Sequence, residues 1–166
     1  MTAVAARTNV ETGKVQRRKL RFETVEEAIA EARRLAALEN AGKAECMGNW
    51  TVGQVLNHCG AWAEYAYKEN PLKTPWVVRV IAGMMKGRFL NKGLLSGQKI
   101  PKVPGGTLAI EPVETGAGLA RFEAAYARLA RENPTHGSPV FGKLTREEMI
   151  KLNLRHSELH MGFVKG

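Results

Sequence analysis

The chain has few cysteines and no long apolar stretch. Only two of its 166 residues are cysteines, Cys46 and Cys59, which excludes a scaffold held by several disulfides. No run of roughly 18 apolar residues occurs, so the sequence predicts no membrane-spanning helix. The first residues also lack the basic stretch followed by an apolar stretch that marks a secretory leader. We therefore expect a cytoplasmic protein, in which Cys59 is a buried thiol among apolar neighbours.

Acidic residues are scarce relative to basic ones. The chain has 25 lysines and arginines against 16 acidic residues, a formal net charge of +9 with neutral histidines. Such an excess favours anionic partners. The 44% of hydrophobic and 25% of charged residues are typical of a globular protein, and the length fits one domain. We expect a flexible, basic arm over residues 1–16 and a single helical domain over residues 17–166.

Three short motifs mark the starts of helices. Thr24, Thr51 and Thr145 are each followed, three residues later, by Glu or Gln. This is the capping box, in which two side chains satisfy free backbone amides at a helix start. Apolar residues at helical spacing follow each motif. The three predicted helices cover residues 24–40, 51–69 and 145–164.

The middle of the chain is less regular. Residues 75–88 predict a shorter, irregular helix that begins at a proline and contains glycines, and residues 96–114 form a long loop. Thr115 is expected to cap another long amphipathic helix, which ends before Pro134. We find no convincing strand pattern. Four long helices with one extended connection between the second and third predict an all-α, four-helix bundle.

The last helix has polar residues on the face that should be buried. One face of this helix carries a charged stripe, which is expected to face solvent: Lys151, Arg155, Glu158 and Lys165. A Glu158→Ala substitution is therefore expected to leave stability almost unchanged. The opposite line is Asn153, His156, Ser157, His160 and Phe163. His156 and His160 are four residues apart, so their imidazoles project from adjacent turns, as two ligands of one metal ion do.

A third ligand has to come from another segment, and two further histidines exist. His58 lies at the edge of the inward face of the second predicted helix, flanked by Gln54 and Trp62. The solvent-facing side of that helix is expected to carry Asn57, Ala61, Glu64 and Lys68. A histidine there is also compatible with a core residue bonded to a carbonyl. His136, in a Gly/Pro-rich loop, is either at the mouth of the site or a plain surface residue. Three neutral imidazoles with an open position would accept Zn, Ni or Fe and a water or substrate.

Two segments resemble the DinB-like superfamily, in a branch of unknown function. They are Trp50–His58, which reads W-x-x-x-Q-x-L-x-H, and Pro139–Glu148 followed by His156–His160. The resemblance covers about residues 17–163. It implies an up-down-down-up four-helix bundle with a divalent metal bound by His58, His156 and His160. Relatives include thiol-dependent transferases and isomerases and metal-dependent hydrolases, and many are homodimers.

Three functions remain open at this stage. The first is a metal-dependent thiol transferase or hydrolase whose basic residues attract an anionic, low-molecular-weight thiol; Gln54, Trp62, Asn153 and His136 would line its site. The second is a non-catalytic module that the metal stabilises. The third, nucleic-acid or membrane-surface binding through the basic segments, is less favoured because no recognition signature accompanies the charge. A homodimer would use Trp76, Met84, Met85 and Phe89.

Overall fold

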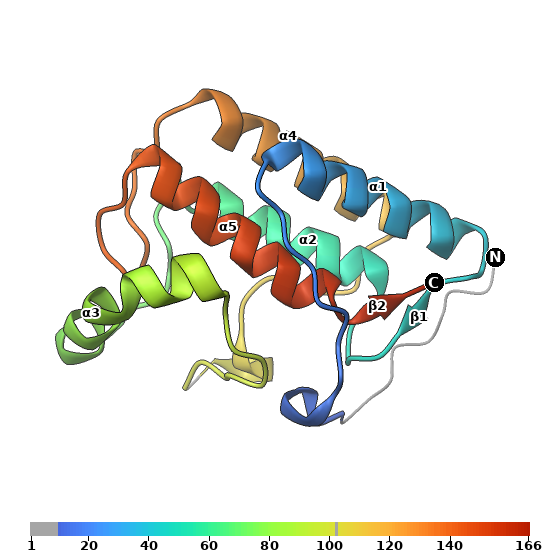
Figure 1. The fold of residues 1–166 in the computed structure, drawn as a ribbon, viewed down its shortest axis with the longest axis horizontal. Coiled ribbons are helices and arrows are strands. Elements are labelled where there is room, and N and C mark those ends of the chain that lie inside the picture. Colours follow the sequence, from blue (N-terminus) through green and yellow to red (C-terminus); the bar gives the residue numbers. More distant parts are fainter. Residues whose placement is uncertain (1–9, 102) are drawn as a thin grey trace.

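The computed structural model describes residues 10–101 and 103–166, and they are mostly helical (Figure 1). The helices are α1 (Val25–Asn40), α2 (Val52–Glu64), α3 (Trp76–Lys92), α4 (Thr115–Arg131) and α5 (Arg146–Met161), with single 3-10 turns η1 (Thr12–Lys14) and η2 (Pro104–Gly106). Two-residue strands, β1 (Glu45–Cys46) and β2 (Val164–Lys165), complete the described elements. Residues 1–9 of the predicted arm, and Lys102, lie outside the described residues. None of the described helices is long and apolar enough to cross a membrane.

The capping boxes predicted the helix starts correctly. Thr24, Thr51 and Thr145 each accept a hydrogen bond from the backbone amide three residues on, and the reciprocal bond is present in all three. α4 differs, because Thr115 is its first residue and Glu114 precedes it without a side-chain cap. α2 is shorter than predicted, since it ends at Glu64 and Tyr65 is its C-cap.

Glycines allow α2 and α4 to approach closely. A Cβ at Gly118 would lie 2.5 Å from the carbonyl oxygen of Gly53, and one at Gly60 would lie 3.0 Å from the backbone nitrogen of Phe122. α4 therefore covers the side of α2 that was expected to face solvent. Asn57 and Ala61 are buried there, with 8% and 2% exposure, which corrects the predicted outward stripe.

The two strands were not predicted. β1 and β2 pair antiparallel, with Glu45 opposite Lys165 and Cys46 opposite Val164. The pair draws the carboxyl terminus back towards the start of α2, so α5 ends at Met161 instead of continuing to about residue 164. Strands of two residues carry too little periodicity to be recognised in a sequence.

α3 stands apart from the other helices, below the start of α5 at the left of Figure 1. It has 17 residues, as many as α4, and continues past Arg88 to Lys92, so the expectation of a short helix was wrong. Gly83 and Gly87 lie within the helix and do not interrupt it, and a Cβ added at either position would meet no atom within 4 Å. Only Ala82 and Leu90 of α3 are buried.

Residues 15–23 lie along α5, and Phe22 among them is buried. The Arg18 backbone amide donates to the carbonyl of Gly162 at 2.8 Å, and its guanidinium pairs with Glu31 of α1 at 2.6 Å. Before this segment, the backbone of Val10 makes two hydrogen bonds with the side chain of Asn49. The described part of the amino-terminal region thus ties α1 to the end of α5.

Candidate metal centre

Three histidines from two helices converge. His58 is on α2, and His156 and His160 are on consecutive turns of α5. One nitrogen of each lies within 4.8 Å of the other two, and the Nε2 atoms of His58 and His156 are 3.2 Å apart. Tetrahedral zinc with bonds of 2.0–2.1 Å needs nitrogens about 3.3 Å apart. The His58–His156 pair already has this spacing, and the group could therefore hold a metal ion if His160 moved closer to it.

A loop carbonyl sets the orientation of His58. Nδ1 of His58 lies 2.8 Å from the carbonyl oxygen of Leu108, a bond that requires the hydrogen on Nδ1. The lone pair is then on Nε2, the atom that faces His156. Two residues on, the carbonyl of Ile110 accepts a 2.8 Å hydrogen bond from Nε2 of Gln54, so α2 holds the loop on both sides of Ala109.

Burial keeps the imidazoles in the form that binds metals. It lowers the pKa of His58 to about 4, although the bond to Leu108 offsets part of the effect. Burial, and then the charge that His58 would carry, lowers the pKa of His156. The pKa of His160 is lowered by burial first, and then by His156, His58 and Arg17. At neutral pH all three imidazoles are uncharged, as metal ligation requires.

Two tryptophans flank the histidines. The ring of Trp50 lies 4.8 Å from that of His58 and stacks on His160 at 5.0 Å, centroid to centroid. Trp62 lies 5.4 Å from His156 and 5.9 Å from His58. Trp62 was predicted to line the site and Trp50 was not. Trp50 is the first residue of the W-x-x-x-Q-x-L-x-H segment that ends at His58, and this place in the motif is the signal that could have identified it.

Two other predicted lining residues have structural partners. The oxygen of the Gln54 side chain completes the capping box by accepting a 3.0 Å hydrogen bond from the Thr51 amide. The Asn153 side chain donates a 2.9 Å hydrogen bond to the backbone carbonyl of Met149. The backbone carbonyl of Asn153 accepts a hydrogen bond from the hydroxyl of Tyr126 on α4.

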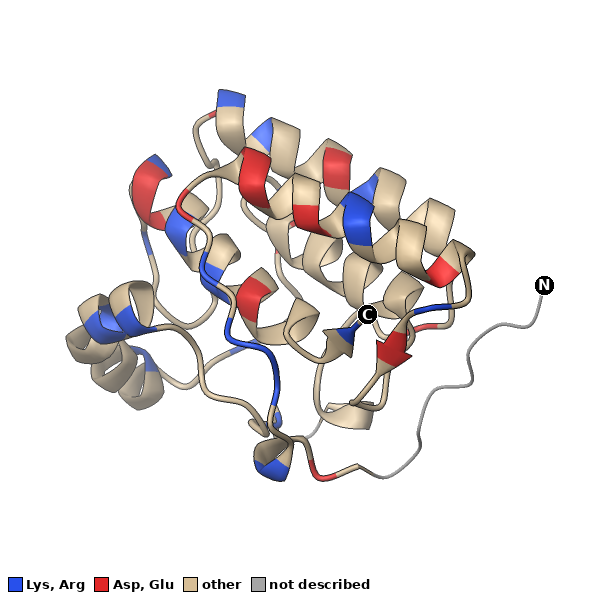
Figure 2. Cartoon of the chain, turned by 45° about the vertical axis from the view of Figure 1, so that its right-hand side comes forward, with Lys and Arg blue, Asp and Glu red and all other residues tan. Residues whose placement is uncertain are grey.

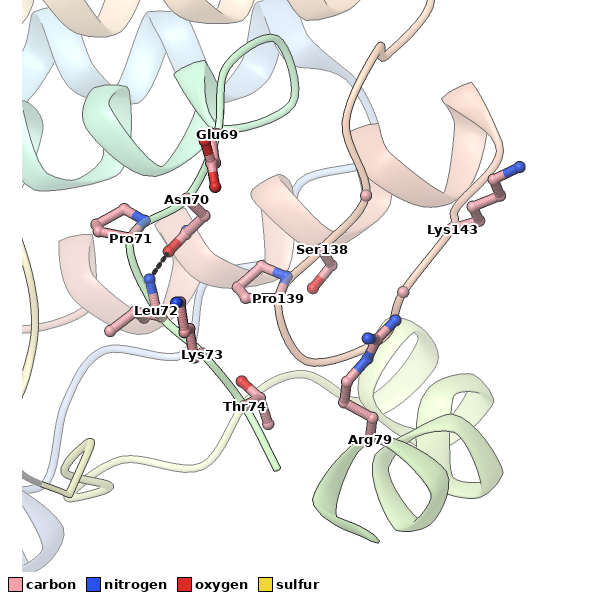
Figure 3. Close-up of a pocket in the computed structure, with 12 residues that line it drawn as sticks. Glu69, Asn70, Pro71, Leu72, Lys73, Thr74, Arg79, Ser138, Pro139 and Lys143 are labelled. Carbon is pink, nitrogen blue, oxygen red and sulfur yellow. Dashed lines mark hydrogen bonds between the residues drawn. The ribbon is translucent and has the colours of Figure 1, made fainter. Parts of the chain in front are cut away.

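His136 is not in the group of three. It is exposed, and its backbone amide donates to the carbonyl of Ala66. The residues that follow it line a cavity of about 530 Å³ between the loops before α3 and α5, where Arg79 and Lys143 are found (Figure 3). The structure thus places His136 beside this cavity and apart from the other histidines.

The other side of α5 buries the residues that were predicted to be exposed. Arg155 and Glu158 have 1% and 5% exposure. Nη1 of Arg155 lies 2.8 Å from Oε1 of Glu158, and the same oxygen accepts a 2.6 Å hydrogen bond from the amide of Phe22. Nη2 of Arg155 donates to the carbonyl of Phe22. The prediction of a solvent-facing stripe was wrong for Arg155 and Glu158, because residues 15–23 cover them, whereas Lys165 is exposed as predicted.

The cysteines carry no reactive thiolate. Both are buried and free, as predicted for Cys59. Burial raises the pKa of Cys59 to about 12, and that of Cys46 to about 11. Because the thiolate is the nucleophilic form, neither side chain is an activated nucleophile.

Comparison with known proteins gives one match. No curated protein and no solved structure matches the chain. A family model matches residues 14–166, a range that includes His58, His156 and His160. The chain belongs to the family described as "Protein of unknown function (DUF1569)".

Proposed function

We propose that the chain binds one divalent metal ion through His58, His156 and His160, in a four-helix bundle of the DinB-like, up-down-down-up type. The observation that carries the proposal is the convergence of three neutral imidazole nitrogens within 4.8 Å, with the tautomer of His58 set by Leu108. Zinc, nickel and iron all suit an imidazole set.

We further propose that the metal centre is catalytic and acts on a thiol or on water. A divalent ion with an open position lowers the pKa of a bound thiol or water and so supplies a nucleophile near neutral pH. Trp50 and Trp62 would exclude bulk water beside the histidines. Among the described residues, the contacts of the three histidines are with one another, with Trp50 and Trp62 and with the Leu108 carbonyl, and none of these groups is a carboxylate that could act as a general base. This favours a thiol-dependent transferase over a hydrolase, with an anionic, low-molecular-weight thiol attracted by the net charge of +9.

A non-catalytic, metal-stabilised module is the second candidate. The three histidines join α2 to α5, so an ion there would cross-link two helices. The tryptophan rings pack closely against the imidazoles, and the cavities of about 530 and 240 Å³ are lined by other residues. In this case the centre would contribute stability and have no room for a substrate.

Metal analysis of the untagged protein, purified without chelator, tests the first step. We expect about one divalent ion per chain, measured by mass spectrometry, and none in His156→Ala. His136→Ala is the matched control, because this histidine lies outside the group, and it should keep the metal. Equal metal content in all three proteins would contradict the site.

Cobalt substitution separates the two candidates. Addition of a low-molecular-weight thiol should change the visible absorption of the cobalt-loaded protein if a coordination position is open. An unchanged spectrum would favour the non-catalytic module.

The family resemblance extends the proposal to a cytoplasmic homodimer. Light scattering of the purified protein tests whether it is a dimer.

A further inference from the structure

The outer face of α3 is an exposed apolar surface. Seven large apolar side chains of this helix are solvent-exposed, among them Trp76 at 75% and Met84 at 83%; the others are Val77, Val78, Val80, Ile81 and Met85. The opposite side of α3 faces the rest of the molecule through buried Ala82 and Leu90 and through an ion pair between Lys86 and Glu148 at 2.6 Å. Contiguous apolar surface of this kind marks an interaction site.

The exposed face continues from apolar into basic residues. Val77, Ile81 and Met84 are followed at helical spacing by Arg88 and Lys92, so all five lie along one side of α3. Arg88 and Lys92 are exposed. One side of the helix therefore presents an apolar half and a positively charged half to the same partner.

The two chain segments that surround and form α3 are rich in basic residues. Residues 70–110 contain seven lysines and arginines and no acidic residue, and residues 12–22 contain five and none. The two segments meet, because Nη1 of Arg21 donates to the carbonyl of Asn91 at 2.9 Å and because Lys19 and Lys92 line the same 240 Å³ cleft. Blue positions mark α3 and the amino-terminal segment beside it in Figure 2. The nearby acidic residues Glu148 and Glu158 are each paired with a basic side chain, Lys86 and Arg155 respectively.

We propose that α3 and the basic residues beside it dock the protein on an anionic lipid bilayer. A helix that lies in the plane of the interface uses an apolar face to enter the bilayer and flanking lysines and arginines to contact acidic headgroups. A second copy of the chain fits less well, because it would bring two predominantly basic surfaces together. Nucleic acid offers phosphates but no apolar phase for Trp76, Ile81 and Met84.

Vesicle co-sedimentation of the full-length protein tests the proposal. Vesicles rich in phosphatidylglycerol should bind it at least about tenfold more tightly than vesicles of phosphatidylcholine alone, and added salt should weaken the binding. Arg88→Glu with Lys92→Glu should reduce binding to acidic vesicles at least about tenfold, as should Trp76→Ser with Met84→Ser. All four side chains are exposed, so these variants should keep the circular dichroism spectrum of the parent. Lys43→Glu with Arg131→Glu is the control with the same change of charge, at exposed positions outside α3 and outside residues 12–22, and it should retain most of the binding.

Two results would overturn the proposal. The first is the absence of binding to acidic vesicles at low salt, and the second is equal binding by the α3 variants and the control. If, in addition, the parent is a dimer by light scattering and Trp76→Ser with Met84→Ser is a monomer, the covering partner of α3 is a second copy of the chain.

Discussion

The two sides of α5 bury ionisable groups in opposite ways. On one side, Arg155 and Glu158 form an ion pair, and each also bonds to a backbone group of Phe22, so both charged groups have partners within the fold. On the other side, His156 and His160 face His58. There, burial holds the groups neutral and leaves their nitrogens directed at one another. A buried charged pair whose partners all lie within the protein has a structural role, whereas neutral imidazole nitrogens that face one another are suited to bind a metal ion.

Removing Glu158 should produce the largest change in stability. Glu158→Ala leaves the guanidinium of Arg155 buried without its counter-ion and the amide of Phe22 without its acceptor. Breaking a buried pair in this way costs about 3–5 kcal/mol. We expect urea denaturation to show a loss of this size, with metal content unchanged per folded chain. This replaces the nearly silent effect expected from the sequence.

Glu147→Ala is the matched control on the same helix. Glu147 is exposed in the first turn of α5, where a carboxylate contributes less than about 1 kcal/mol. Similar losses in the two variants would mean that the buried pair adds nothing beyond an ordinary surface glutamate.

Acidification should destabilise the histidine side of the metal-free protein. Below pH 6.5 the unfolded chain protonates His58, whereas the folded protein keeps this side chain neutral down to about pH 4. The unfolded state therefore binds more protons in this window, and stability falls as the pH falls. His58 alone accounts for about 3 kcal/mol between these limits. Urea denaturation at several pH values, with chelator present, should show the decline in His136→Ala as well, and a smaller one in His58→Gln. An equal decline in His58→Gln would contradict this origin.

Added metal should stabilise the same side at neutral pH. An ion at 100 times its dissociation constant stabilises the folded state by about 2.7 kcal/mol, which raises the melting temperature of a chain of this size by about 5–10 °C. The shift should disappear in His156→Ala and with chelator. Glu158→Ala starts from a lower melting temperature and should show the same shift. A shift that survives in His156→Ala would place the metal elsewhere.

The comparison also shows what the sequence could and could not reveal. Local rules predicted the starts of three helices, because a capping box depends only on residues three apart, and the spacing of His156 and His160 predicted a pair on one face. The burial of Arg155 depends on Phe22, a residue more than 130 positions away that brings no distinctive motif. The role of Leu108 belongs to a backbone carbonyl, and no side-chain pattern encodes it.

The smallest predicted effect concerns the loop that orients His58. Ala109 has φ of 57°, a left-handed conformation that costs an alanine about 1 kcal/mol or more and costs a glycine almost nothing. The loop adopts it while Leu108 bonds to His58 and Ile110 bonds to Gln54. Ala109→Gly should therefore leave stability unchanged or raise it by up to about 1 kcal/mol, even though glycine favours the unfolded chain. Ala109→Val should lower stability and metal affinity together, because a β-branched residue resists this conformation and displaces the Leu108 carbonyl. If the valine variant binds zinc as tightly as the parent in a calorimetric titration, the tautomer of His58 does not depend on this loop.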